Sequence, residues 1–421
     1  MGMLNWYKES DSNQKKTFWA CYAGWALDSY DMQIFSFLLP VIMATWALTQ
    51  TQVGLIGTVA LIVTAIGGWI AGILADRYGR VKILMFTILW FTFFGVLAGF
   101  AQNYEQLLVA RTLQGLGFGG EWAVGAALMA EAVSAKHKNK AVGFVQSGMA
   151  LGWAGSVIVA TILITMLPPE WSWRVVFWTG VIPALIVIYI RRNVKESVEF
   201  VNDVAKNKEN IEKASFSSIF KKEYLRSTIF ASLLVIGLQA ACYAILIWIP
   251  TLMNERGLSP SSKIVTILIM AAGAFAGFMF TAYLADKWGR KQTLIGMSIL
   301  SWIVTVVYML IAMNQYITLA LGFFVGFSAI GMFAALGPFL TDLFPTHIRT
   351  TGMGFSYNVG KSFGALSVVG VGILAESLGL ATSIGLFCLT AYALATISIL
   401  LIKVNKEELT PTPSLYKKQE A

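Results

Sequence analysis

Two carboxylates stand close together inside an apolar stretch of the chain. Asp28 and Asp31 lie three residues apart in the run 17–42, and Asp28 is about eleven residues from its start. At 1.5 Å per helical residue this depth is roughly 16 Å, near the middle of a hydrocarbon layer of ~30 Å. Burial favours the neutral form of a carboxyl group, and a negative charge one helical turn away favours it further. The pair therefore has the chemistry of a group that takes up and releases protons. The alternative is that one aspartate only hydrogen-bonds the backbone and orders the helix.

Three further charges lie inside apolar runs. Arg111 and Glu121 belong to the run 106–131, and Lys361 lies about eleven residues into the run 350–375. Ionisable groups in such places are costly and mark functional sites. Arg111 either pairs with one of the aspartates or meets a substrate carboxylate, and Glu121 is either a second proton site or a structural hydrogen-bonding group. Lys361 either binds an anionic substrate or neutralises a carboxylate of the protein itself.

Polar and aromatic side chains occur at similar depths in several runs. Each of them alone is more often a packing residue than a ligand contact, but together they can line one polar cavity between helices. We expect them to form the substrate site with Lys361. They are Tyr22, Trp25, Gln146, Trp153, Gln239, Tyr243, Tyr357 and Asn358.

Membrane-spanning helices are the elements that must hold these side chains. Hydrophobic residues make up 57% of the chain and charged residues 13%, about half of the ~25% charged residues found in soluble proteins. Apolar runs of ~20 residues, long enough to cross a bilayer, recur along the whole chain. We expect an all-α membrane protein with twelve transmembrane helices, at 17–42, 52–74, 83–101, 106–131, 140–165, 173–190, 226–252, 264–284, 292–312, 316–341, 350–375 and 380–402.

One short phrase occurs twice at half the chain length. GILADRYGRVK covers Gly72–Lys82 and YLADKWGRK covers Tyr283–Lys291, so Asp76 and Asp286 are 210 residues apart. A loop repeated at this offset indicates two pseudo-symmetric six-helix bundles, as in secondary transporters. We expect an N-terminal bundle over 1–190, a cytoplasmic linker over 191–225, a C-terminal bundle over 226–405 and a cytoplasmic tail over 406–421.

Basic residues gather on alternate connections between the predicted spans. The positive-inside rule then places both termini and the linker on the cytoplasmic side of the cell membrane. Membrane flanks also account for the net charge of +9, so we do not predict a nucleic-acid partner. The sequence has no paired Cys or His spacing typical of a metal site, no GxxxxGK[ST] phrase for a nucleotide, and no nucleophile–base pair. We therefore expect a monomeric transporter without cofactor or metal, and not an enzyme.

The repeated loops carry charged residues that could hold the two halves together. Gly79 and Gly289 permit a tight turn. A carboxylate can lie near a helix N-terminus while an arginine pairs with a neighbouring span, and such a latch would release in another state. The alternative is that the basic residues only set the topology, or that these are solvated helix ends. The predicted latch comprises Asp76, Arg77, Gly79, Arg80, Asp286, Gly289 and Arg290, with Glu131, Asp342 and Arg349 as a second set in which Asp342 faces Arg349.

These motifs resemble those of the major facilitator superfamily. The loop Gly72–Arg80 is similar to its main signature, and Arg111-Thr-Leu-Gln-Gly-Leu-Gly is similar to its Arg-x-x-x-Gly-x-Gly element. More narrowly, several phrases resemble the sialate:proton symporter branch, near the aromatic-acid:proton symporters, which also carry paired aspartates in the first span. Lys361 departs from that branch, where a small residue is expected. The phrases are LDSYDMQIF (27–35), RTLQGLGFGGEW (111–122), KNKAVGFVQSG (138–148), WSWRVVFWTGVIP (171–183) and GFSYNVG (354–360).

The resemblance implies proton-coupled uptake of a small organic anion, such as sialate or a similar monocarboxylate, by alternating access. The residues that we predict to couple protons are Asp28, Asp31, Arg111 and Glu121, and the superfamily resemblance favours this role for Arg111. Two other functions fit the same sequence, an aromatic-acid or other carboxylate permease and a drug:proton efflux pump. A mostly neutral, aromatic cavity would favour efflux, whereas Arg111 and Lys361 facing the cavity favour uptake of an anion.

Overall fold

The computed structural model describes residues 5–133, 138–194, 216–310, 315–345 and 348–402. Within these ranges the regular structure is helical. The predicted linker falls largely on 195–215 and the predicted tail on 406–421, so both lie outside the described residues.

The first half of the chain forms six long helical rods after a short helix. The sixth rod is broken by a turn of 3₁₀ helix, so that α7, η1 and α8 together make one span. The elements are α1 (Asn5–Glu9), α2 (Ser12–Trp46), α3 (Gln50–Tyr78), α4 (Arg80–Ala98), α5 (Tyr104–Ala132), α6 (Lys138–Met166), α7 (Pro169–Trp178), η1 (Thr179–Val181) and α8 (Ile182–Asn193).

The second half repeats this plan. Its fourth rod consists of α13, a π-helical segment and α14, and its fifth rod consists of α15 and α16. The elements are η2 (Phe216–Phe220), α10 (Lys222–Glu255), α11 (Pro260–Trp288), α12 (Arg290–Leu310), α13 (Gln315–Val325), η3 (Gly326–Ile330), α14 (Phe333–Thr341), α15 (Arg349–Gly364), α16 (Leu366–Leu378) and α17 (Leu380–Leu401).

The predicted all-helical membrane fold is confirmed, and each predicted apolar run lies on one rod. In the described residues, ten rods are long and apolar enough to cross a membrane by length and composition. The other two, α2 and α5, have 35 and 29 residues. These two helices carry Asp28, Asp31, Arg111 and Glu121, so the charges that lower their hydropathy are the candidates for chemistry.

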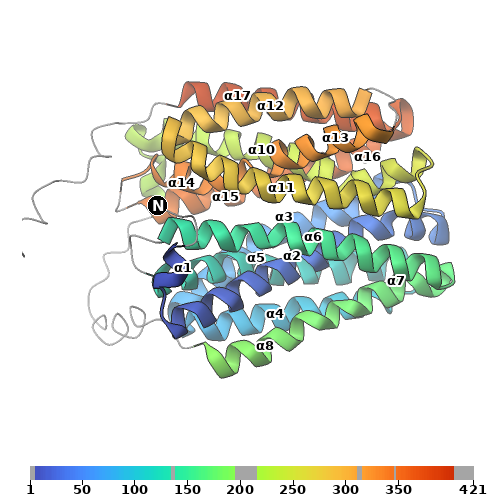
Figure 1. Ribbon diagram of the computed structural model, residues 1–421, viewed down its shortest axis with the longest axis horizontal. Helices are drawn as coiled ribbons and strands as arrows, with labels where there is room; N and C mark the ends of the chain where they lie inside the picture. Colours follow the sequence, from blue (N-terminus) through green and yellow to red (C-terminus); the bar gives the residue numbers. More distant parts are fainter. Residues whose placement is uncertain (1–4, 134–137, 195–215, 311–314, 346–347, 403–421) are drawn as a thin grey trace, which may run out of the picture.

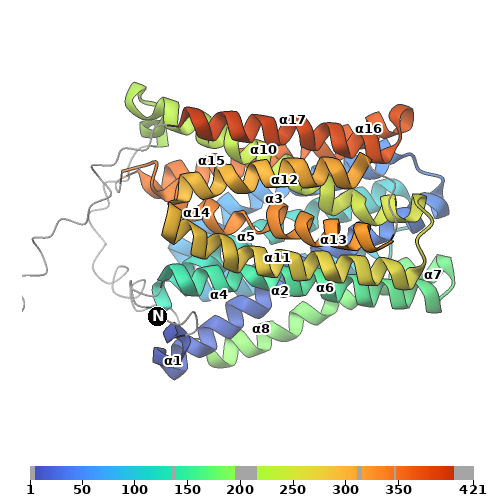
Figure 2. The same cartoon turned by 45° about the horizontal axis from the view of Figure 1, so that its top comes forward.

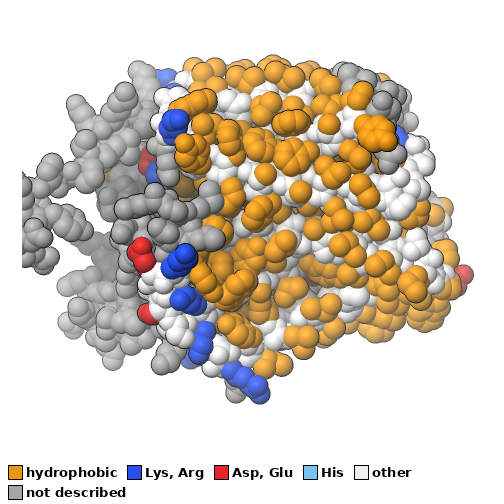
Figure 3. Space-filling view, viewed as in Figure 1, with side chains coloured by type: hydrophobic (Ala, Val, Ile, Leu, Met, Phe, Trp, Pro, Cys, Tyr) orange, Lys and Arg blue, Asp and Glu red, His pale blue; other side chains and the backbone are white. Residues whose placement is uncertain are grey.

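The rods lie side by side along the long axis in two groups. Helices α2–α8 form one group and α10–α17 the other, as Figures 1 and 2 show. The N-terminal helix α1, the α3–α4 turn and the α11–α12 turn lie at one end, which we call the basic end. The space-filling view in Figure 3 shows apolar side chains around the middle of the molecule and Lys and Arg side chains gathered at the basic end. This is the surface of a protein whose middle lies in lipid.

Two glycines make the same turn in both halves. Gly79 joins α3 to α4 with φ 103° and ψ 145°, and Gly289 joins α11 to α12 with φ 93° and ψ 148°. L-residues with a side chain rarely adopt these angles, so the repeated phrase needs glycine at this position. The turn reverses the chain within one residue and brings the following helix directly against the preceding one.

The helix crossing at the centre of each half is also repeated. Gly67 of α3 lies against the backbone of Leu116 in α5, and Gly277 of α11 lies against the backbone of Phe327 in η3. A Cβ atom at either glycine would collide with the carbonyl oxygen of the facing helix. Close backbone approach through small residues is the usual way in which membrane helices pack. The crossing at Gly67 fixes the position of α5, and therefore of Arg111.

Candidate functional site

Asp31 belongs to a hydrogen-bonded chain inside the N-terminal half. Its Oδ2 accepts a bond of 2.6 Å from Nε2 of Gln114, and the Oε1 of Gln114 accepts one of 2.5 Å from Nη1 of Arg111. Asp31 and Gln114 have no exposed surface, and Arg111 is 3% exposed. The amide of Gln114 thus links an acid on α2 to a cation on α5. In the absence of such a partner, a buried charge would be strongly destabilising.

Glycines and aromatic rings enclose this chain. A Cβ on Gly180 of η1 would lie 2.9 Å from Oδ1 of Asp31, and a Cβ on Gly95 of α4 would lie 3.3 Å from Oδ2. The guanidinium of Arg111 lies 4.6 Å from the ring centre of Phe35 and 5.9 Å from that of Phe177, within the range of cation–π attraction. All these residues belong to one half of the molecule, so Asp31 faces its own bundle.

Asp28 has a different environment, although it is only one helical turn away. Its side chain is 3% exposed, and its Oδ1 makes no hydrogen bond in the described part of the chain. The charges that act on it are those of Lys361 from the other half and of Asp31 from its own helix. Asp28 is therefore a buried acid without a described hydrogen-bond partner, and the opposite charge that acts on it belongs to the other half.

Lys361 lies on the face of α15 that is directed at α3. Asn358 and Ala365 stand three residues before and four residues after it, on the same helical face. The Oδ1 of Asn358 lies close to Gly68 of α3, and the carbonyl of Ala365 accepts a hydrogen bond of 3.0 Å from Thr58 Oγ1. Lys361 is half-buried and makes no hydrogen bond or contact ion pair with another described residue. An ammonium group thus stands near mid-depth at the interface, attracted by Asp28 but not in contact with it.

The other predicted site residues fall into two groups, one on each side of the interface. Trp25 donates from Nε1 to the carbonyl of Gln146 at 3.3 Å, and the backbone of Tyr22 lies against Gly148, so these residues belong to the α2–α6 contact. In the other half, Gln239 and Tyr243 are buried on α10, and Tyr357 and Asn358 lie on α15. Their roles as ligands remain predictions.

Two glutamines near the aspartates were missed by the sequence analysis. Gln114 is the link between Asp31 and Arg111 described above. Gln33 is 1% exposed, and neither its Oε1 nor its Nε2 has a hydrogen-bond partner among the described residues. A signal for Gln114 was available, because it stands one turn after Arg111 inside an apolar run. A glutamine in an apolar run is a weaker sequence signal than a charged residue, although burying an unpaired amide is also costly.

At the end opposite the basic end, the halves are joined by hydrogen bonds. Thr58 of α3 donates from Oγ1 to the carbonyl of Ala365 and accepts from the amide of Val369, each at 3.0 Å. Gln50 donates to Oε1 of Glu255 at 2.9 Å. A small cavity lies between the halves at this end, and its lining includes Pro40, Thr161, Pro250 and Lys263. Its volume is about 80 Å³, which holds only a few water molecules. This end is closed.

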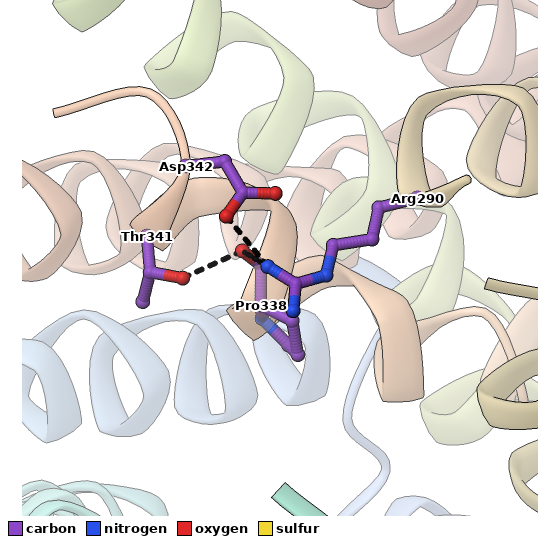
Figure 4. A network of polar contacts seen from close by, with 4 residues as sticks. All are labelled: Arg290, Pro338, Thr341 and Asp342. Atoms are coloured by element: carbon purple, nitrogen blue, oxygen red, sulfur yellow. Dashed lines mark hydrogen bonds and ion pairs between the residues drawn. The ribbon is translucent and has the colours of Figure 1, made fainter. Parts of the chain in front are cut away.

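At the basic end, the described ion pair lies within one half. Figure 4 shows Arg290 at the start of α12 reaching the end of α14, where its Nη1 contacts Oδ1 of Asp342 at 2.6 Å and the carbonyl of Pro338 at 3.0 Å. Thr341 donates to the same carbonyl at 2.6 Å. Asp342 thus pairs with Arg290, whereas its predicted pairing with Arg349 involves a side chain outside the description and stays a prediction. The side chains of Asp76, Arg77, Glu121, Glu131, Asp286 and Arg349 lie outside the description, so the rest of the predicted latch remains a prediction.

Comparison with known proteins identifies the family. Residues 22–369 match the model of the Major Facilitator Superfamily. The chain belongs to this superfamily. Among solved structures, the D-xylose-proton symporter shares the fold with a TM-score of 0.76 at 18% identity, over 93% of this chain and 98% of that one. The predictions of the fold and of a transporter rather than an enzyme are confirmed.

Several curated relatives match nearly the whole chain. A probable 4-methylmuconolactone transporter of Cupriavidus pinatubonensis is 62% identical over 95% of this chain and 93% of its own length. The sialic acid transporter NanX of Escherichia coli is 30% identical over 94% and 95%. A cis,cis-muconate transport protein of Acinetobacter baylyi is 29% identical over 87% and 89%. The superfamily is therefore established, but these relatives do not single out the sialate branch.

Proposed function

We propose that this superfamily member takes up a small organic acid together with protons, and that its substrate is a muconolactone-type lactone acid. The observation that carries the proposal is the position of Lys361. It is a half-buried cation near mid-depth, on the face that one half turns to the other. A cation there attracts anions and disfavours the cationic substrates of many efflux pumps.

The relatives support the choice of substrate. The protein that is 62% identical over 95% of this chain is named for 4-methylmuconolactone, and more distant relatives are named for cis,cis-muconate and sialic acid. All three compounds are carboxylic acids. A muconolactone adds a flat, neutral lactone ring to its carboxylate, so a site with one cation and several aromatic or amide groups suits it.

The proposed orientation assigns the two ends of the carrier to the two sides of the membrane. The positive-inside rule assigns the basic end, with both termini and the linker, to the cytoplasm of the cell membrane. The hydrogen-bonded opposite end then faces outward, and we propose that this is an inward-facing state of a monomeric carrier. Alternating access would open the bonds of Thr58 and Gln50 while closing the basic end, where we propose that the charged loops with Arg290 and Asp342 act as the latch.

Transport into proteoliposomes tests the proposed function. The purified protein is given labelled 4-methylmuconolactone, cis,cis-muconate, sialate or benzoate, with an inward proton gradient and with or without a protonophore. We expect accumulation of the lactone acid above equilibrium, which the protonophore abolishes and empty liposomes do not show. Preferential accumulation of benzoate or sialate would change the substrate class. If no acid is accumulated, or an organic cation is expelled instead, the proposal is wrong.

A further inference from the structure

We infer that Lys361 binds the carboxylate of the substrate. We further infer that Asp28, not Asp31, is the partner of Lys361 that the substrate displaces, and that Asp28 then takes up the coupled proton. This inference rests on the proposed function and deepens it. In the empty carrier, Lys361 and Asp28 neutralise each other across the interface. In the loaded carrier, Lys361 neutralises the substrate, and Asp28 is neutral because it is protonated.

The contacts of Asp31 make it unsuitable for this exchange. Its Oδ2 is held by Gln114, which in turn is held by Arg111, and Gly95 and Gly180 close around the carboxyl group. This chain ties α2 to α5 inside one bundle. Asp31 is linked through Gln114 to Arg111 in its own half, so its pairing does not change when the substrate binds. Asp31 is therefore a positioning residue that fixes the rotation of α2.

Asp28 lacks such a partner. The side chain is 3% exposed, and its Oδ1 has no hydrogen bond among the described residues, as is also true of Oδ1 of Asp31. The difference is that no described residue holds Asp28 as Gln114 holds Oδ2 of Asp31. The charged groups that act on it are Lys361 from α15 and Asp31 from its own helix, while Arg111 of α5 acts on Asp31. Tyr243 is buried on α10, and the side chain of Glu121 on α5 lies outside the description. Of these groups, Lys361 is the cation that balances Asp28.

The relation between Lys361 and Asp28 is loose. Their charges interact, but nitrogen and oxygen are not within the 4.0 Å of a contact ion pair. A tight, fully hydrogen-bonded pair would resist displacement, since breaking it leaves two buried charges. A loose pair can be replaced by a better one, and a substrate carboxylate that touches the ammonium group is a better partner.

Charge balance gives the stoichiometry of the exchange. The empty site holds Asp28 as carboxylate and Lys361 as ammonium. When one monoanion binds to Lys361, Asp28 loses its counter-charge, and one proton from water forms an O–H bond with its carboxylate. The site gains one negative and one positive charge and remains neutral. We therefore expect one proton per monocarboxylate at this site.

Binding experiments on the purified full-length protein separate the two aspartates. The probe is 4-methylmuconolactone, titrated calorimetrically at several pH values, with proton uptake followed by an indicator dye in weak buffer. We expect the wild type to take up about one proton per bound monoanion. Asp28→Asn should bind without proton uptake and with little pH dependence, and should perform counterflow but not accumulation. Asp31→Asn, if folded, should still take up the proton.

Variants of Lys361 test whether this residue binds the substrate carboxylate. Losing a hydrogen bond to a charged group costs about 1.5–3 kcal/mol, so Lys361→Gln should weaken binding by roughly ten- to a hundredfold. Lys361→Arg should retain much of the affinity. Lys82→Gln, which removes an exposed lysine at the basic end, should bind as the wild type does. Asp28→Asn combined with Lys361→Gln should restore thermal stability lost in either single variant.

Two results would overturn the inference while leaving the proposed function intact. One is normal proton uptake by Asp28→Asn. The other is wild-type affinity of Lys361→Gln. If the wild type binds and accumulates none of the four acids, the proposed function itself fails, and this assignment fails with it.

Discussion

Glu376 of α16 caps the N-terminus of α3, although the two helices belong to different halves of the molecule. Its Oε1 accepts hydrogen bonds from the amide of Thr51 at 3.2 Å and from the hydroxyl of Thr51 at 2.6 Å. A helix N-terminus attracts a carboxylate because its first amide groups have no partner within the helix. The first turns of α3 make hydrogen bonds to the other half at Gln50, Thr51 and Thr58. Opening this end must break them.

Replacing Glu376 should shift the carrier towards the outward-open state. Glu376→Ala removes both bonds to Thr51, which hold the closed state, so we expect a larger population of molecules that are open at this end. Spin labels on Gln102→Cys and Ser261→Cys, exposed in different halves at this end, measure the distance. The native Cys21, Cys242 and Cys388 are buried and should remain unlabelled. An unchanged distance distribution would show that this carboxylate does not hold the end closed.

Thr58 should act through its hydroxyl group alone. The hydroxyl satisfies the carbonyl of Ala365 and the amide of Val369, where the rod of α15 and α16 is interrupted. Thr58→Val keeps the shape but leaves the amide of Val369 without this partner, while the carbonyl of Ala365 still accepts from the amide of Val368. We expect the closed state to lose about 1–3 kcal/mol. The same distance measurement should show more open molecules for Thr58→Val than for Thr58→Ser. Equal behaviour of the two variants would count against this role.

Gln114 should matter for the stability of the N-terminal half. Gln114→Leu removes the group that joins Asp31 to Arg111 and leaves both without this partner. We expect a loss of about 2–4 kcal/mol in the free energy of unfolding, seen as a lower melting temperature in detergent. Thr112→Val is a matched control in the same helix, because its hydroxyl bonds only to the carbonyl of Leu108. If both variants melt alike, the link through Gln114 contributes nothing measurable.

Two glycines of α3 should differ sharply when changed to alanine. Gly67 lies on the backbone of Leu116, whereas a Cβ on Gly72 would have nothing within 4 Å. Gly67→Ala forces two helices apart and should destabilise the protein by about 1–3 kcal/mol or more. Gly72→Ala should be neutral or slightly stabilising because alanine favours helix. Thermal unfolding of the two variants checks this, and similar melting temperatures would contradict the described crossing.

Much of the fold could be predicted from the sequence, because the bilayer imposes it. A span needs ~20 apolar residues, and a duplicated half repeats its glycine turn, so the rods and the positions of Gly79 and Gly289 were found from the residues alone. The rods extend beyond the apolar runs, as in α2 (Ser12–Trp46), since their polar ends continue as helix outside the core.

The different surroundings of Asp28 and Asp31 could not be predicted from the sequence. Asp28 and Asp31 are three residues apart, which places them on overlapping faces of one helix. The rotation of α2 decides which of them faces the other half. That rotation depends on contacts with Gln114, Gly95 and Gly180 from three other elements. The pairing of Arg290 with Asp342 likewise depends on how α12 meets the end of α14, which no local pattern encodes.

The separate surroundings of the two aspartates have a consequence for the evolution of such carriers. Asp31 is tied to its own bundle, so its partners can remain the same while the transported compound changes. Asp28 and Lys361 lie on opposite halves of a duplicated chain, and we propose that they neutralise each other through the interface. A relative that exchanges lysine 361 for a neutral residue should therefore tend to change position 28 as well, and the two substitutions together would mark a change of cargo charge. We therefore expect positions 28 and 361 to covary among relatives, and positions 31 and 361 to vary independently.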